Sequence, residues 1–276
     1  YNSQTQKVYY AKNAEVRSAP ASFTKLLSSQ VALDLVPLEY LITASKDSVD
    51  KVPTVLGLKV GEKISVADLL RGAIATSAND AAQTLADGAA QAVGISQPEF
   101  IYYMNTKAQF LGLKNSHFAN PDGLDDQNQY STLLDIAKLV NNVQKNYPDI
   151  LSAAQSDRQD IEKTATHGRY YLPNWNGLLG VYPGVTGLKI AYTEEAGYST
   201  IVTAERDGFS MVAIVSGADS YLERDLAAAN LLDAGFLAEG LPPINVTKNA
   251  LNQHYHEWGD LARQIQAELK AAESNI

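Results

Sequence analysis

Ser22 and Lys25 have the side-chain types and the spacing that nucleophilic catalysis requires. They lie three residues apart at the start of an expected helix, where such a pair shares one face. A serine hydroxyl becomes a strong nucleophile when a neighbouring base removes its proton, and a lysine with a lowered pKa can be that base. The positive end of the helix dipole would favour the developing anion. Taken alone, such a pair is more often a helix cap beside a solvated lysine.

Ser77 and Asn79 form a second candidate pair, at a break between two alanine-rich helical patterns. A tight turn between helices presents both side chains from one rigid corner. There, Ser77 could relay a proton and Asn79 could hold the lysine or a substrate amide. Serine and asparagine are also common at ordinary helix ends, and this reading is preferred for the motif in isolation.

The elements that position these residues follow from the spacing of apolar residues. Helical periodicity is found after residue 22, from residue 65, and at roughly 80–93, 98–111, 132–143 and 221–234. In the fifth of these, Thr132 and Asp135 form an expected capping pair. Strand-like stretches are found at 7–10, 52–64, 170–172, 187–192, 198–204 and 210–216. This order predicts an α/β (α+β) fold in which helices flank an antiparallel sheet and an all-helical lobe is inserted.

The last 36 residues differ from the rest of the chain. A proline pair at 242–243 separates them, and a helical apolar stripe follows at Trp258, Leu261, Ile265 and Leu269. A membrane-surface helix would carry a polar face rich in lysine and arginine, whereas this face is largely acidic. We therefore expect one main domain at 1–240, with its helical lobe at about 38–160. The tail at 241–276 is expected to be a docking helix or the start of a linker.

Composition excludes several functions. The 276 residues carry a net charge of −9 and have a pI near 4.9, which disfavours binding to nucleic acid or anionic lipid. Cysteine is absent, so disulfides, thiolate zinc sites and a cysteine nucleophile are excluded. The four histidines form no metal-binding pattern, and no cofactor is predicted. No apolar stretch is long enough to span a membrane, and the start of the chain is typical of a mature or trimmed form.

Taken together and in order, the motifs resemble the low-molecular-weight penicillin-binding proteins, the D,D-carboxypeptidases, whose site is defined by S-x-x-K, S-x-N and K-T-G. The resemblance spans about residues 7–237. It is carried by residues 20–26, 77–82, 104–105, 111–113, 117–124, 130–132, 176–179, 182–185, 192–198 and 231–236. It implies a β-lactamase/transpeptidase-like fold.

The resemblance also implies a role for each matching position. Ser22 would be the acylated nucleophile and Lys25 its base, and the backbone N–H groups of Ser22 and Tyr192 would form the oxyanion hole. The remaining site residues would be Ser77 and Asn79 in the proton and substrate network, Lys189 of the third motif, Arg224 at the substrate carboxylate, and Ile190 beside the substrate.

The third motif departs from the family pattern. Lys189-Ile190-Ala191 stands where the family has Lys-Thr-Gly. A register that ends the motif at residues 186–187 would put Val185 at the lysine position, and the flanking matches argue against it. Ile190 cannot donate to a substrate carboxylate, and losing such a hydrogen bond costs roughly 1.5–3 kcal/mol. We therefore expect an enzyme that is weakened and not inactive.

These observations lead to a functional prediction. The chain is expected to be a serine D,D-carboxypeptidase that cleaves the terminal D-Ala of peptidoglycan stem peptides and is acylated by β-lactams. It is expected outside the cytoplasm of a bacterium, with membrane contact only through a segment not in this chain. One alternative is a degenerate homologue that binds wall peptide or a protein partner without turnover. A β-lactamase or esterase on the same scaffold is disfavoured, because residues 130–132 and 231–236 look like the carboxypeptidase branch.

Overall fold

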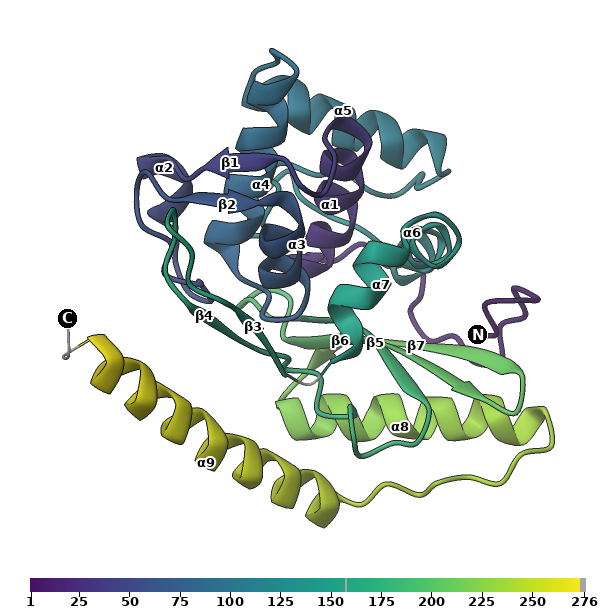
Figure 1. Ribbon diagram of the computed structural model, residues 1–276. Coiled ribbons are helices and arrows are strands. Elements are labelled where there is room, and N and C mark those ends of the chain that lie inside the picture. Colours follow the sequence, from purple (N-terminus) through teal and green to yellow (C-terminus); the bar gives the residue numbers. More distant parts are fainter. Residues whose placement is uncertain (157, 274–276) are drawn as a thin grey trace.

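The computed structural model describes residues 1–156 and 158–273 and has two lobes (Figure 1). The helical lobe contains the 3₁₀ helix η1, helices α1 to α5 and a small hairpin, β1–β2. Their bounds are η1 Ala21–Phe23, α1 Thr24–Leu35, β1 Leu41–Thr43, α2 Lys46–Val49, β2 Lys63–Ser65, α3 Val66–Ile74, α4 Asn79–Ala92 and α5 Gln97–Phe110. Within this lobe, alanine-rich α4 packs against both α1 and α3. The division expected from the sequence, with a helical lobe at about 38–160, stays a prediction.

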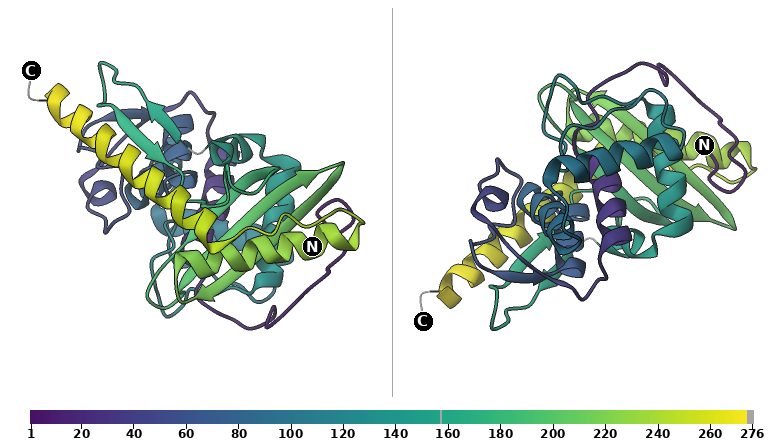
Figure 2. Two further views of the ribbon diagram at one scale, coloured as in Figure 1. Left: turned by 90° about the horizontal axis from the view of Figure 1, so that it is seen from below. Right: turned by 90° about the horizontal axis from the view of Figure 1, so that it is seen from above.

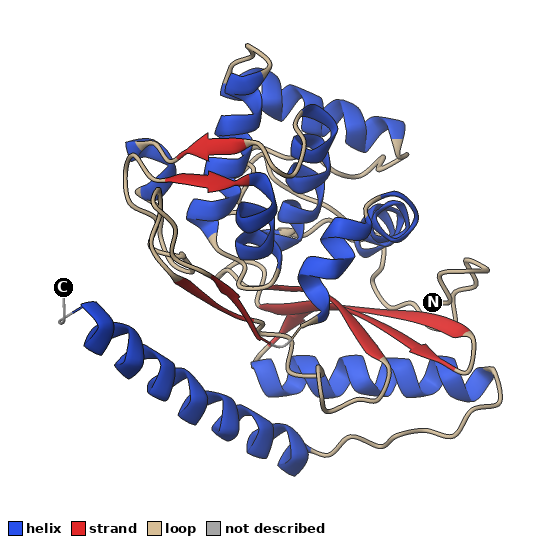
Figure 3. Ribbon diagram, viewed as in Figure 1, coloured by secondary structure: helices blue, strands red, loops and turns tan. Residues whose placement is uncertain are grey.

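The second lobe is built on an antiparallel sheet of order β5-β6-β7 (Figure 3). Helix α8 covers one face, while α6 and α7 lie on the other (Figure 1). A separate hairpin, β3–β4, pairs beside the sheet. The bounds are α6 Leu133–Asn146, α7 Pro148–Gln155, β3 Arg158–Ile161, β4 Tyr170–Pro173, β5 Val185–Ala191, β6 Tyr198–Arg206, β7 Phe209–Ala218 and α8 Tyr221–Ala238. The antiparallel sheet flanked by helices confirms the predicted fold class.

Several predicted helix starts are confirmed by their caps. The Thr132 hydroxyl accepts from the Asp135 N–H at 3.2 Å and begins α6. The Ser65 hydroxyl accepts from the Asp68 N–H in the same way and begins α3. Such caps satisfy backbone N–H groups that have no partner inside the helix.

The strand predicted at 52–64 is wrong apart from its last two residues. Only β2 forms there, and the preceding backbone binds a carboxylate instead of another strand. The two Asp80 carboxylate oxygens accept from the N–H groups of Leu56, Gly57 and Leu58 at 2.8–3.0 Å. Because these donors are satisfied by a side chain on α4, the segment remains a loop.

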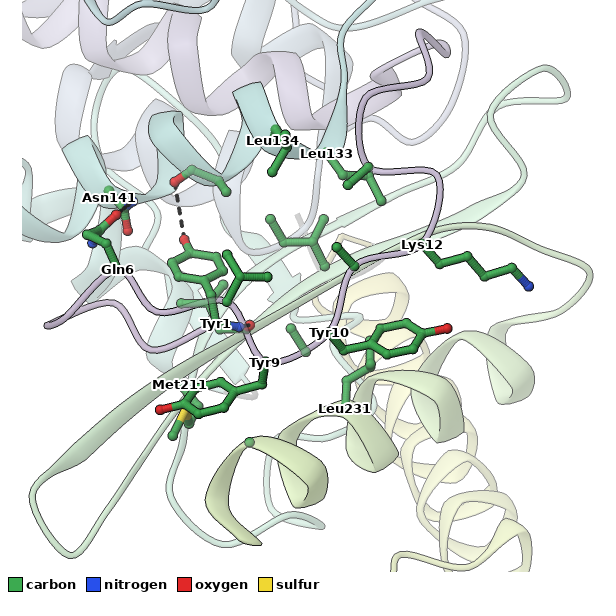
Figure 4. A pocket seen from close by; sticks show the side chains of 18 of the residues that line it. Tyr1, Gln6, Tyr9, Tyr10, Lys12, Leu133, Leu134, Asn141, Met211 and Leu231 are labelled. Atoms are coloured by element: carbon green, nitrogen blue, oxygen red, sulfur yellow. Dashed lines mark hydrogen bonds between the residues drawn. The ribbon is translucent and has the colours of Figure 1, made fainter. Parts of the chain in front are cut away.

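The strand predicted at 7–10 is also wrong. The β7 edge is already occupied by residues 1–3, because Tyr1 exchanges two backbone hydrogen bonds with Val212 and Asn2 bridges to Met211. Strand propensity is expressed only where a partner edge is available. Residues 8–12 instead line an apolar cavity of about 270 Å³ above β7, where Figure 4 shows Tyr9 and Tyr10 with Leu231 of α8.

The tail is helical, as predicted, and forms α9, Lys248–Glu273. The linker before it is fixed by Asp233 of α8, whose carboxylate accepts from the backbone N–H groups of residues 244 and 245 at 2.8 and 2.9 Å. Trp258 and Ile265 of the predicted stripe are buried, whereas the side chain of Leu269 lies outside the described part of the chain. The C-terminal end of α9 extends to the periphery in every view (Figures 1 and 2). Among the described helices, none has the length and apolarity needed to cross a bilayer.

Candidate active site

Ser22 and Lys25 lie where η1 runs into α1. Their side chains are within hydrogen-bond distance, with 2.9 Å between Lys25 Nζ and Ser22 Oγ. Ala21, immediately before the serine, has a φ of 46°, a strained value for a residue with a side chain. Strain of this kind is held in place by its surroundings and is concentrated at functional sites. The contact between the two side chains holds the Ser22 hydroxyl next to the buried amine of Lys25.

Lys25 is completely buried, and three oxygens surround its amine. Besides Ser22 Oγ, Nζ donates to Asn79 Oδ1 at 2.7 Å and to the backbone carbonyl of Asp122. Burial disfavours the charged form and lowers the pKa of Lys25 to about 7, while the Asp122 and Asp80 carboxylates oppose that change. The amine can therefore be neutral near neutral pH, as a general base requires.

Ser77 and Asn79 occupy the corner between α3 and α4, as the sequence predicts. Ser77 has a φ of 63° and is nearly buried. Asn79 is fixed at both ends, because its N–H donates to the Thr54 carbonyl at 2.7 Å and its Nδ2 to the Val52 carbonyl at 2.9 Å. Its Oδ1 is thereby aimed at Lys25. The two motifs, 54 residues apart, meet at that amine.

A pocket of about 110 Å³ opens above Ser22, between the helical lobe and the end of β5. Four other predicted site residues line it with Ser22: Ser77, Asn79, Ile190 and Tyr192. The rest of its wall comes from Pro53, Thr54, Asp122, Gly123, Leu124 and Thr193. It shares no residue with the larger cavity of Figure 4.

Gly123 lets the loop at 121–124 approach the nucleophile. Its φ is +86°, and a Cβ there would overlap the Ala21 carbonyl and lie 3.0 Å from the Ser22 N–H. Only glycine combines this left-handed conformation with so close an approach. The same loop delivers the Asp122 carbonyl to Lys25. Residues 122–124 therefore form part of the pocket wall.

The third motif lies on β5. Lys189 is buried, and its Nζ donates to the Ile190 carbonyl at 3.0 Å. Burial lowers the pKa of Lys189 well below its usual value, and the nearby positive charges of Lys25 and Arg224 lower it further. Ile190 faces the pocket with an apolar side chain, and Ala191 is packed in the core.

Arg224 is not among the residues that line the pocket. It lies in the first turn of α8, and its side chain is 4% exposed. Its Nε and Nη2 donate to the Asp225 carboxylate at 2.7 and 3.1 Å. This ion pair compensates the positive charge of the buried guanidinium group. The structure thus places it within electrostatic reach of Lys189 but behind the pocket wall.

Asp122 makes two contacts at the site that could not be identified from the sequence. The Asp122 backbone carbonyl contacts Lys25, and the Asp122 carboxylate pairs with Lys51 at 3.0 Å. A backbone acceptor leaves no trace in residue type, so the sequence alone gave Asp122 no role of its own. The glycine that follows Asp122 was the available signal, since it indicates a close backbone approach.

The fold is similar to that of solved DD-transpeptidase and penicillin-binding protein structures. The structure of a Streptomyces K15 DD-transpeptidase mutant matches with a TM-score of 0.78 and 30% identity, over 86% of this chain and 95% of that one. Penicillin-binding protein D2 of Listeria monocytogenes, solved with cefotaxime bound, matches with a TM-score of 0.74 and 28% identity, over 86% and 94%.

The chain belongs to the D-alanyl-D-alanine carboxypeptidase family, whose model matches residues 1–220. It is 32% identical to the D-alanyl-D-alanine carboxypeptidase DacF of Bacillus subtilis, over 84% of this chain and 59% of that protein. It is 33% identical to DacA of Escherichia coli, over 90% of this chain and 62% of that protein. The chain therefore spans about three fifths of the length of these relatives. This membership confirms the resemblance inferred from the motifs.

Proposed function

We propose that this chain is a serine D,D-carboxypeptidase that removes the terminal D-Ala of peptidoglycan stem peptides through an acyl-enzyme on Ser22. The observation that carries the proposal is the contact between Ser22 Oγ and Lys25 Nζ, an amine whose burial lowers its pKa to about 7. A nucleophile and a base at this distance are the minimum that acyl transfer requires. Family membership and the names of the relatives support the same activity.

In the proposed reaction, neutral Lys25 takes the proton of Ser22 as Oγ attacks the carbonyl carbon of the penultimate D-Ala. The negative charge develops on the carbonyl oxygen, where the N–H groups of Ser22 and Tyr192 would donate. Their presence in one pocket supports this role. Breaking the C–N bond releases the terminal D-Ala, whose amine takes the proton that Lys25 removed from Ser22, with Ser77 as the relay. Water then hydrolyses the ester and restores the serine.

We propose that the third motif makes this enzyme slow. Ile190 lines the pocket beside Ser22 and cannot donate to the carboxylate of the peptide or of a β-lactam. A hydrogen bond to a charged group contributes roughly 1.5–3 kcal/mol, so its loss should lower the acylation rate about ten- to a hundredfold. Arg224, behind the pocket wall, would remain as a cation whose charge attracts that carboxylate.

A catalytically inactive binder of wall peptide is the alternative. The apolar wall that Ile190 adds to the pocket is the observation that favours it. Under this alternative Ser22→Ala would leave ligand affinity unchanged and no turnover would be detected in either protein.

We further propose that the chain acts outside the cytoplasm of a bacterium, on peptidoglycan stem peptides and β-lactams. The relatives in the comparison come from bacteria, and one structural neighbour carries the β-lactam cefotaxime. The net charge of −9 makes a nucleic-acid partner unfavourable.

Intact mass spectrometry after incubation with penicillin tests the proposal, with Ser22→Ala as the matched control. We expect a mass increase of one penicillin on the parent and none on the variant. Release of D-Ala from a stem peptide, measured on both proteins, tests turnover. An unmodified, folded parent protein that releases no D-Ala would support the binding alternative instead.

A further inference from the structure

Arg224 is held by groups from three different segments. Asp225 binds Nε and Nη2, and the Trp175 carbonyl accepts from Nη2 at 3.3 Å. The third partner is the hydroxyl of Tyr255, which accepts from Nη2 at 3.0 Å. Among the described residues, no hydrogen bond involves Nη1, so one edge of the guanidinium group keeps its donors.

Tyr255 comes from α9, which lies beyond the 220 residues that the family model matches. Its hydroxyl also donates to Asp225, so it uses both of its hydrogen-bonding functions within this cluster. Burial, together with the Asp225 carboxylate, raises the pKa of Tyr255 far above its usual value, which keeps the hydroxyl protonated and able to donate. Tyr255 therefore closes a ring of hydrogen bonds with Arg224 and Asp225.

Aromatic contacts dock α9 at this place. Trp258, one turn after Tyr255, meets Trp175 edge to face with 5.9 Å between ring centroids. Tyr255 also packs against Tyr221 at the start of α8, at 4.6 Å. The Trp175 carbonyl and the Tyr255 hydroxyl both accept from Nη2 of Arg224. Helix α9 therefore supplies one of these two acceptors and packs, through Trp258, against the residue that supplies the other.

Gly177 is required for this approach. A Cβ at Gly177 would overlap both the Tyr255 hydroxyl and the Asp225 carboxylate. The φ of Gly177 is not in the left-handed region, so backbone conformation does not explain why a glycine is needed at this position. The backbone at 177 is thus shaped around the hydrogen-bonded cluster.

We propose that Tyr255 of α9 is a positioning residue that holds the buried Arg224 in place behind the pocket wall, so that its charge acts on the carboxylate of the substrate. The proposal rests on the proposed function, in which Arg224 is the remaining cation whose charge attracts that carboxylate. A cation in the first turn of α8 is disfavoured by the helix dipole, so its orientation depends on fixed partners. Without the hydroxyl, Arg224 keeps its contacts with Asp225 and the Trp175 carbonyl but loses one of the three partners that hold Nη2.

Tyr255→Phe tests this inference, because it removes the hydroxyl and keeps the ring. Kinetics would be measured on a stem peptide ending in D-Ala and on an ester of the same acyl group whose neutral alcohol leaving group has no carboxylate. We expect kcat/KM to fall about tenfold on the peptide and less than twofold on the ester. Tyr221→Phe, the same chemical change one ring away, is expected to change neither substrate by more than twofold.

Gly177→Ala perturbs the same cluster from its other side and is expected to show the same selectivity for the carboxylate substrate. Thermal unfolding of each variant would show whether it is folded at the assay temperature. Equal losses on both substrates, or none on either, would overturn the positioning role alone. A parent chain that neither turns over the peptide nor is acylated by penicillin would overturn the proposed function, and the inference with it.

Discussion

Ile190 of β5 lies directly opposite Thr200 of β6, and the Thr200 hydroxyl is buried with no hydrogen-bond partner among the described residues. Side chains of residues paired across antiparallel strands lie on the same face. The family's threonine at position 190 would put a hydroxyl beside this one. The substitution in the third motif has therefore changed both the wall of the pocket and the satisfaction of a buried polar group.

Ile190→Thr is expected to stabilise the sheet and to speed acylation. A cross-strand threonine pair contributes about 0.2–1 kcal/mol, and the restored donor should raise the penicillin acylation rate roughly tenfold. Adding Ala191→Gly should raise that rate further. Urea unfolding and acylation kinetics measure the two effects separately. In a Thr200→Val background, the gain in stability should disappear, while the gain in rate should remain.

Acylation by penicillin is expected to rise with pH and to level off above about pH 7. Lys25 must be neutral to accept the serine proton, and burial lowers its pKa to about 7. Below that pH the amine is protonated and the rate should fall tenfold per unit. The rate constant would be measured between pH 5 and 9 with a chromogenic β-lactam. A rate that is still rising steeply at pH 9 would show that the pKa is not lowered.

Stability is expected to increase with pH in the alkaline range because of Lys25. Its folded pKa is depressed, so between pH 7 and about 10 the unfolded chain binds a proton that the folded chain does not. One such proton raises the free energy of unfolding by up to about 1.4 kcal/mol per pH unit. Buried Lys189 contributes with the same sign. Urea unfolding at pH 7.5 and 9 should show a smaller slope for Lys25→Met than for the parent.

Gly123→Ala is expected to damage the site more than the fold. The added Cβ would overlap the Ala21 carbonyl and press on the Ser22 backbone in a left-handed conformation. We expect a loss of about 1–3 kcal/mol in stability and more than tenfold in acylation rate. Gly57→Ala is the matched control, since Gly57 has a φ of +83° and nothing within 4 Å of the added Cβ. Similar effects of the two substitutions on acylation would mean that the close approach of Gly123 is unimportant.

The sequence by itself determined the local geometry of the nucleophile and the family. The spacing of Ser22 and Lys25 places them on one turn of a helix, because the helical repeat is fixed at about 3.6 residues. The caps at Ser65 and Thr132 were predictable for the same reason, since each involves atoms only three residues apart. The ordered motifs then identified the fold.

Only the tertiary structure decided which distant groups meet. The Asp122 carbonyl reaches Lys25 across 97 residues, and Tyr255 binds Arg224. Within the part of the chain that the structure describes, the Thr200 hydroxyl is left without a hydrogen-bond partner. Contacts of this kind depend on how whole elements pack, and residue types record neither a backbone acceptor nor the docking of a helix. Burial is likewise a property of the packed molecule. The proposed role of Lys25 as a base needs a lowered pKa, but only the folded structure shows the burial that lowers it.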